Sequence, residues 1–166
     1  LRPISLTSFV VKVMKSVIYD QMVKFLLENC LVPSEQYGFL PGKSIQTNFL
    51  CRLCEWTKEL DVGNTIDVLY LDFCKAFDRV PRYRWLLKLR HLGIRNNLLA
   101  WIEGFLLNRT LQVQLGTSLT QLVQVLSGVP QGSVLGPLLF LVYTAELKNV
   151  IKSPFAMYAD DIKLYN

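Results

Sequence analysis

The 166-residue sequence has few of the residues on which several common kinds of enzyme depend. His91 is its only histidine, and nothing around it resembles the nucleophile context of a Ser/His/Asp enzyme. No apolar run is long enough to cross a membrane, and the first residues lack the charged-then-apolar pattern of a signal peptide. Internal repeats and low-complexity tracts are missing as well. We therefore expect one globular domain, or a large piece of a bigger one, that has no membrane partner.

Cysteine is limited to four residues, of which Cys51 and Cys54 form a C-x-x-C pair. No second pair and no histidine lies at the spacing of a zinc site. We therefore favour two small core residues one turn apart on a helix over a pair of zinc ligands. Reduced thiols in an intracellular protein fit this usage better than disulfides.

Acidic residues are in the minority, with 13 Asp and Glu against 18 Lys and Arg, which gives a formal net charge of +5. This excess is compatible with an anionic partner, of which nucleic acid is the first candidate, but charge alone is weak evidence. An ordinary solvated basic face explains the same charge. The composition, 51% hydrophobic and 19% charged, is that of a folded domain.

The spacing of apolar residues predicts a mixture of helices and strands. Helices are expected at about 7–29, 45–60, 82–90, 95–107 and 134–150, and strands at 65–72, 111–115, 121–126, 155–158 and 162–165. The near-continuous apolar run at 65–72 predicts a strand that is buried on both faces. Two local hairpins among helices favour an α+β fold over a doubly wound parallel sheet.

Three aspartates stand out because of their places in these elements. Asp72 ends a predicted strand, and Asp160 and Asp161 occupy the tip of a hairpin 88 residues later (160 − 72). A buried carboxylate is costly unless it binds a cation, and adjacent carboxylates repel each other. Magnesium prefers such oxygen ligands, and two ions can stabilise both oxygens of a phosphoryl transfer. A polar turn at 160–161 and a helix N-cap at Asp72 explain the residues equally well.

The segment Gly38–Ser44, with the sequence GFLPGKS, has some features of a phosphate-binding P-loop. That motif has four residues between its glycines, whereas this segment has three, and no strand is predicted before it. We therefore do not expect a P-loop NTPase. Lys43 is either a phosphate contact or an ordinary loop lysine.

Five motifs, in order along the chain, resemble the reverse transcriptases of non-LTR (LINE-type, jockey-like) retrotransposons. They are LRPISL at 1–6, EQYGF with GKS at 35–44, LDFCKAFD with VP at 71–81, SGVPQGSVLGP at 127–137 and YADD at 158–161. The resemblance implies a polymerase right hand, with fingers at about 1–62 and a palm at about 63–166 whose antiparallel sheet is backed by helices. The family's primer grip and thumb would follow the last motif, so we expect a partial chain without the thumb.

The same resemblance implies an RNA-directed DNA polymerase that transfers nucleotides from a dNTP to a DNA primer 3′-OH on an RNA template. Two Mg²⁺ ions, for which Mn²⁺ can substitute, are implied cofactors. The implied metal ligands are the side chains of Asp72, Asp160 and Asp161 and the backbone carbonyl of Phe73.

Nucleotide contacts are implied for Lys75, Ala76, Phe77, Gln131 and Gly132. Phe77 falls at the family's steric gate, where an aromatic ring would crowd a ribose 2′-hydroxyl. A core phenylalanine is the simpler interpretation of Phe77, and a solvated surface lysine is an equal interpretation of Lys75. Further candidates for phosphate or template contact are Arg2 and Lys43.

Leu40 departs from the family pattern, which has an arginine there that reaches the incoming triphosphate. Loss of this cation should weaken nucleotide binding and the stabilisation of charge in the transition state. The alternative function is therefore a catalytically inactive, truncated remnant that at most binds nucleic acid. In either case the family implies an intracellular location, in the nucleus and in a cytoplasmic ribonucleoprotein.

Overall fold

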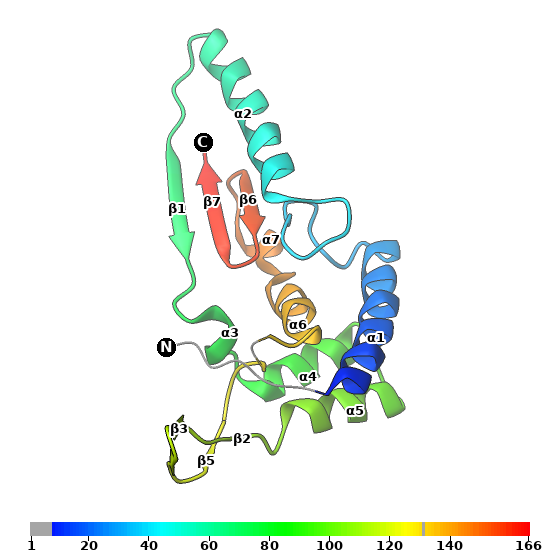
Figure 1. The fold of residues 1–166 in the computed structure, drawn as a ribbon. Helices are drawn as coiled ribbons and strands as arrows, with labels where there is room; N and C mark the ends of the chain where they lie inside the picture. The colour runs from blue at the N-terminus through cyan, green and yellow to red at the C-terminus, as the bar shows by residue number, and fades with distance from the viewer. Residues whose placement is uncertain (1–7, 131) are drawn as a thin grey trace.

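The computed structural model describes residues 8–130 and 132–166, which form seven helices and seven strands (Figure 1). The helices are α1 (Phe9–Glu28), α2 (Ile45–Asp61), α3 (Ala76–Arg79), α4 (Arg82–His91), α5 (Asn96–Leu106), α6 (Leu135–Thr144) and α7 (Leu147–Val150). The strands are β1 (Val68–Asp72), β2 (Thr110–Leu111), β3 (Gln114–Leu115), β4 (Ser118–Leu119), β5 (Val123–Gln124), β6 (Phe155–Tyr158) and β7 (Asp161–Tyr165). Helices mixed with antiparallel sheets confirm the predicted α+β class.

Polar caps explain where the two longest helices begin. The Ser8 side chain accepts a hydrogen bond from the backbone N–H of Val11 at 3.4 Å at the start of α1. Ser44 and Thr47 form a capping box at the start of α2, in which each side chain accepts from the other residue's backbone N–H. Such caps satisfy N–H groups that lack a partner in the first turn. Both helices match the predicted ranges within one or two residues.

The sheet that carries the three aspartates consists of three antiparallel strands in the order β1-β7-β6. In its register Asp72, the last residue of β1, lies opposite Asp161, the first residue of β7. Helix α2 runs beside this sheet (Figure 1) and packs against β6. The predicted hairpin at 155–165 is confirmed, with its turn at 159–160.

Strand β1 does not have the predicted burial. We expected both faces to be covered, yet Leu69 is 56% exposed and Tyr70 is 65% exposed. The reason is that β1 contacts mainly β7 at its side, whereas α2 packs on β6 at the other end of the sheet, so both faces of β1 are left largely uncovered in the described part of the chain. An apolar run thus indicated a strand correctly, but it could not indicate the strand's place in the sheet.

The main hydrophobic core lies below the sheet in the orientation of Figure 1, among helices α1, α4, α5 and α6. The indole N–H of Trp85 donates to the carbonyl of Leu139 at 2.8 Å, which fastens α4 to α6. The residues in this core that are least exposed are Leu26, Trp85, Leu89, Ile102, Leu106, Leu135, Leu138 and Leu139. Helix α1, which falls in the predicted fingers, shares this core with predicted palm helices. The division into fingers (1–62) and palm (63–166) stays a prediction.

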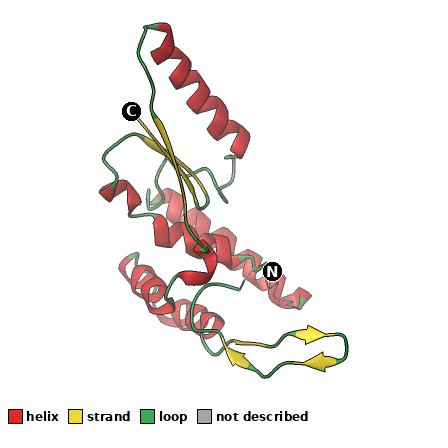
Figure 2. Cartoon of the chain, turned by 90° about the vertical axis from the view of Figure 1, so that its left-hand side faces the viewer, coloured by secondary structure: helices red, strands yellow, loops and turns green. Residues whose placement is uncertain are grey.

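Residues 110–124 form an arm that projects from the helices (Figure 2). Strand β2 pairs with β5 and β3 pairs with β4, so the predicted hairpin through Gly116 is present as two short ladders. All eight strand residues are exposed, which differs from the half-burial that the alternating pattern predicted. The arm extends beyond the core, so no second layer covers its apolar side chains in the described part of the chain.

Cys51 and Cys54 lie one turn apart on α2, as expected, but both are exposed, so their interpretation as core residues was wrong. The physical reason is that α2 turns one narrow face toward the sheet and leaves these positions in solvent. All four cysteines carry free thiols. Within residues 8–130 and 132–166, no helix is both long and apolar enough to cross a membrane.

Candidate active site

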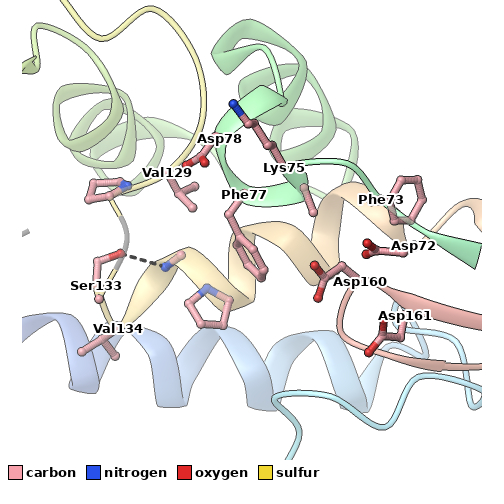
Figure 3. Close-up of a pocket in the computed structure, with 15 residues that line it drawn as sticks. Asp72, Phe73, Lys75, Phe77, Asp78, Val129, Ser133, Val134, Asp160 and Asp161 are labelled. Carbon is pink, nitrogen blue, oxygen red and sulfur yellow. Dashed lines mark hydrogen bonds between the residues drawn. The ribbon is translucent and has the colours of Figure 1, made fainter. Parts of the chain in front are cut away.

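Folding brings the three predicted metal ligands together from two places in the sequence (Figure 3). Asp72 and Asp161 are direct neighbours across β1 and β7. Opposite residues in an antiparallel pair have Cα atoms about 4.5–5.5 Å apart. Asp160 precedes Asp161 in the β6–β7 turn, so all three carboxylates lie at one end of the sheet.

A cavity of about 940 Å³ opens beside these carboxylates. Its walls come from the end of β1, from α3, from the 129–137 segment and from the β6–β7 turn. It is lined by Asp72, Phe73, Lys75, Ala76, Phe77, Asp78, Val129, Pro130, Gly132, Ser133, Val134, Gly136, Pro137, Asp160 and Asp161. Three of the five motifs thus meet at one cavity.

Mutual repulsion among the carboxylates is visible at Asp161. Partial burial raises the pKa of Asp161, the neighbouring charges of Asp160 and Asp72 raise it further, and Lys163 opposes the shift. Like charges raise a carboxyl pKa only when they are close together in space. The site therefore concentrates negative charge and favours a cation.

Four of the five predicted nucleotide contacts line the same cavity as the carboxylates. Lys75, Ala76 and Phe77 form the entry to α3, where Lys75 has a left-handed backbone (φ +53°) and Ala76 is buried. The Phe77 ring points toward α6, where it packs on Phe140 with ring centroids 4.7 Å apart (Figure 3). Gly132 lines the same cavity.

Phe77 is half-buried, so its two interpretations are compatible: it packs against α6 and still forms part of the cavity wall. The Lys75 side chain extends away from the carboxylates in Figure 3. Phe73 lines the cavity too, and its ring meets Phe140 edge-on with centroids 6.3 Å apart.

Three further candidates are not placed in the cavity. Arg2 and Gln131 lie outside the described residues. Lys43 is not among the lining residues: its ammonium donates to the backbone carbonyls of Ser34 and Gln36 and lies 4.7 Å from the centroid of the Tyr37 ring. These bonds stabilise the loop before α2, as expected if Lys43 is an ordinary loop lysine.

Sequence reasoning missed the residues that hold the loops around this cavity. Gln36 is almost fully buried and hydrogen-bonds the backbone of Ala159 in the β6–β7 turn. Arg109, at the end of α5, donates to the backbone carbonyls of Ser127 and Gly128. Burial lowers the pKa of Arg109 to about 10, with a smaller contribution from nearby Arg82, so it stays cationic at neutral pH.

The 127–129 turn packs directly on α3. The Ser127 hydroxyl donates to the carbonyl of Asp78 at 2.6 Å, and the N–H of Val129 donates to the carbonyl of Phe77 at 2.9 Å. Gly128 has φ +73°, and a Cβ there would lie 2.6 Å from the Cα of Asp78. Only glycine fits such a close approach with a positive φ. This contact explains why the motif has glycine at this position.

The donor set suits a hard divalent cation. Among the described residues, no group of three His, Cys, Asp or Glu side chains is arranged to hold a metal ion by itself. Magnesium does not require such a group, because it is usually held by one or two carboxylates together with water and substrate phosphates. Three repelling carboxylates beside an open cavity fit that mode of binding.

Comparison with known proteins gives one family over the whole chain. Residues 1–166 match the family described as reverse transcriptase (RNA-dependent DNA polymerase). The probable RNA-directed DNA polymerases from transposons BS and X-element of Drosophila melanogaster are 30% and 31% identical, over 98% and 97% of this chain. The polymerase from mobile element jockey of the same species is 32% identical over 88% of this chain. The chain spans 16–19% of the length of these relatives.

Solved structures with the same fold include telomerases. The telomerase from Candida albicans in complex with a TWJ fragment of telomeric RNA matches with a TM-score of 0.66 and 12% identity. The match covers 92% of this chain and 30% of the telomerase chain. The apo telomerase from Candida tropicalis truncated from its C-terminal domain has a TM-score of 0.64 and 13% identity, over 92% of this chain and 33% of its own. At such identities the likeness shows the fold alone.

Proposed function

This chain belongs to the reverse transcriptase (RNA-dependent DNA polymerase) family, and we propose that it is part of the polymerase of a mobile element. The proposed reaction is nucleotidyl transfer from a dNTP to the 3′-OH of a DNA primer on an RNA template. The observation that carries the proposal is the single cavity that Asp72, Asp160 and Asp161 share with the α3 entry and the 129–137 segment.

We propose Mg²⁺ as the cofactor, in two ions, with Mn²⁺ able to replace it. Asp72, Asp160 and Asp161 would hold the ions, with help from the backbone carbonyl of Phe73. When bound, such ions stabilise the charge on the attacking and leaving oxygens of the phosphoryl transfer. The clustered negative charge that raises the pKa of Asp161 supports this assignment.

The rest of the cavity would bind and select the nucleotide. Backbone N–H groups of Lys75 and Ala76 are candidates to bind the triphosphate, because both residues line the cavity. The Lys75 side chain extends away from the carboxylates (Figure 3), so we assign this role to the backbone. The Phe77 ring, held against Phe140, would exclude a ribose 2′-hydroxyl and so favour dNTPs. Gln131 and Gly132 would lie beside the nascent base pair, where glycine permits close approach.

A second candidate is an inactive remnant that only binds nucleic acid. Leu40 favours it: the residue is 7% exposed, so this position contributes apolar packing where the family pattern has a cation. A remnant would bind RNA in a salt-sensitive manner without incorporating dNTPs. For either candidate we propose an RNA partner and a location in the nucleus and in a cytoplasmic ribonucleoprotein.

Primer extension on an RNA template tests the proposal, with the full-length protein that contains this chain. Asp160→Asn should lower the rate at least about 100-fold, because it removes charge on which transition-state stabilisation depends. Asp67→Asn, a matched change at an exposed aspartate before β1, should leave the rate unchanged. Equal extension by Asp160→Asn would exclude the proposed site. RNA binding without any incorporation by the unmodified protein would favour the remnant.

A further inference from the structure

We propose that Gln36 is a positioning residue for polymerisation: its buried side-chain amide fixes the backbone of the β6–β7 turn and thereby the placement of Asp160 and Asp161. This inference rests on the proposed function, because it assigns a role relative to the proposed metal ligands. Gln36 lies 123 residues from the turn in sequence and outside the cavity, so it acts through the turn and not on substrate.

Both the oxygen and the NH₂ group of the Gln36 amide form hydrogen bonds with the turn. Its carbonyl oxygen accepts from the N–H of Ala159 at 3.0 Å and from the N–H of Gly38 at 2.7 Å. Its NH₂ group donates to the carbonyl of Ala159 at 3.2 Å. Both backbone groups of Ala159 are thus bound by one side chain that is 1% exposed.

Ala159 needs such support because its backbone is in the left-handed region, with φ +57°. An L-residue with a Cβ is disfavoured there, and such backbone persists only where surrounding structure holds it. Asp160 is the next residue, and Asp161 begins β7. Any relaxation of Ala159 toward a more favourable conformation would therefore rotate the segment that carries both carboxylates.

The backbone on either side of Gln36 is held against β6 as well. The N–H of Met157 donates to the carbonyl of Glu35 at 2.8 Å, and the N–H of Tyr37 donates to the carbonyl of Met157 at 2.9 Å. These two bonds form a parallel bridge between Gln36 and Met157. A fixed backbone therefore holds the Gln36 amide against the turn, along the edge of β6 that faces away from β7.

Gly38 completes the contact by permitting close approach. A Cβ on Gly38 would lie 2.8 Å from the Cα of Ala159 and closer still to its backbone nitrogen. Those atoms are backbone, so a side chain at position 38 would push the turn away. Gln36 and Gly38 thus hold the same turn by two different physical means, a pair of hydrogen bonds and an absent side chain.

Asn48 offers a matched control. Its side-chain amide is also buried, at 3% exposed, and also donates to the β6–β7 hairpin, but to the carbonyl of Met157, two residues before Ala159. Gln36→Met and Asn48→Leu each replace a buried amide with an apolar side chain of similar size. Gln36→Met removes the bonds to both backbone groups of Ala159, whereas Asn48→Leu removes one bond to Met157, so only Gln36→Met releases the left-handed turn.

The test compares Gln36→Met, Gly38→Ala and Asn48→Leu in the full-length protein. The measurements are the melting temperature, kcat and KM for dNTP in primer extension, and Mn²⁺ affinity from electron paramagnetic resonance, with Asp160→Asn to define binding at this site. Gln36→Met and Gly38→Ala should each lower kcat and Mn²⁺ affinity about 10- to 100-fold, whereas Asn48→Leu should change both less than about threefold. The KM for dNTP should change little, because the α3 wall is untouched.

The outcomes separate this inference from the proposed function. Equal effects of Gln36→Met and Asn48→Leu on Mn²⁺ affinity, at similar melting temperatures, would reduce Gln36 to a stability role and overturn the inference. If the unmodified protein binds Mn²⁺ but incorporates no dNTP, the proposed function fails, and the Mn²⁺ comparison still decides the role of Gln36. If it does not bind Mn²⁺ at Asp160, both fail.

Discussion

Asp161 shows at the residue scale what the site requires. It lies opposite Asp72 and next to Asp160, and burial together with both charges raises its pKa. In the folded protein without metal these repulsions oppose folding. The same repulsions would be relieved by a divalent cation, so the residues that destabilise the free site are the ones that would bind the ion.

Asp161→Asn should therefore stabilise the protein in the presence of a chelator, by about 0.5 kcal/mol at neutral pH, because it removes like charges on opposite strand positions. The raised pKa means that the folded state holds its proton more tightly than the unfolded state. The penalty is thus present above the folded-state pKa and absent below the ordinary value of 3.8. Denaturant titration should show a gain at pH 7 that shrinks as the pH falls through this range. A loss of stability at pH 7 would contradict the electrostatic account.

Sequence reasoning found the three aspartates but not Gln36. Acidic residues at a strand end and a hairpin tip are visible in a sequence as local patterns. The bonds of Gln36 to Ala159 cross 123 residues and involve backbone atoms, which carry no residue-specific signal. Its neighbour Gly38 gave a partial signal, since a glycine in a loop can mark a close backbone approach.

At the scale of elements, the contact between α3 and the 127–129 turn holds a second loop of the cavity, and Gly128→Ala tests this contact. Both Gly128 and Gly93 have positive φ, but a Cβ on Gly128 meets backbone of Asp78 whereas a Cβ on Gly93 meets nothing within 4 Å. Gly93→Ala should cost about 1–2 kcal/mol from the backbone alone. Gly128→Ala should cost a further ~2 kcal/mol from overpacking. Equal costs in denaturant titrations would show that α3 and the turn do not press on each other.

Arg109 ties the same turn to the end of α5. Arg109→Met should destabilise the protein by about 2 kcal/mol, because the carbonyls of Ser127 and Gly128 lose a charged donor. Arg109→Lys keeps the charge but not the planar fork, so it should recover only part of the loss. Arg84→Met, at an exposed arginine of α4, serves as the control in the same thermal unfolding experiment. Full recovery by lysine would show that charge alone matters.

The positions of helices and strands along the chain were predicted better than their burial. Caps and apolar periodicity placed α1, α2, α4 and α5 within a few residues, because these signals are local. The exposed faces of β1 and of the 110–124 arm were not predicted, since burial depends on which element lies opposite. Helix α3 was missed because four residues are too few to show a period.

At the scale of the whole molecule, positive charge is concentrated in one segment. Residues 79–102 contain six Lys and Arg and no Asp or Glu, which leaves 12 basic against 13 acidic residues elsewhere. Exposed Arg90 and Arg95 line a groove of about 580 Å³ with His91, between the end of α4 and the start of α5. Four of these six residues lie on α4, Arg79 ends α3 and Arg95 precedes α5, so the excess charge is carried largely by α4 and the residues that flank it.

This distribution predicts where nucleic acid phosphates would bind outside the cavity. The double change Arg90→Glu and Arg95→Glu should weaken RNA binding and reduce the slope of log affinity against log salt by about 2, one for each lost phosphate contact. Lys12→Glu with Lys58→Glu makes the same change in net charge on α1 and α2, and should leave the slope closer to that of the unmodified protein. Equal slopes for the two double variants in salt titrations would show that only net charge matters.

The most direct test of the central claim is to locate Mn²⁺ by anomalous diffraction in crystals of the full-length protein with primer, RNA template and dNTP. The account predicts anomalous peaks within about 2.0–2.3 Å of carboxylate oxygens of Asp72 and Asp160, with Asp161 beside them. Ordered carboxylates without Mn²⁺, in crystals that bind the ion elsewhere, would contradict the assignment of this cavity as the polymerase site.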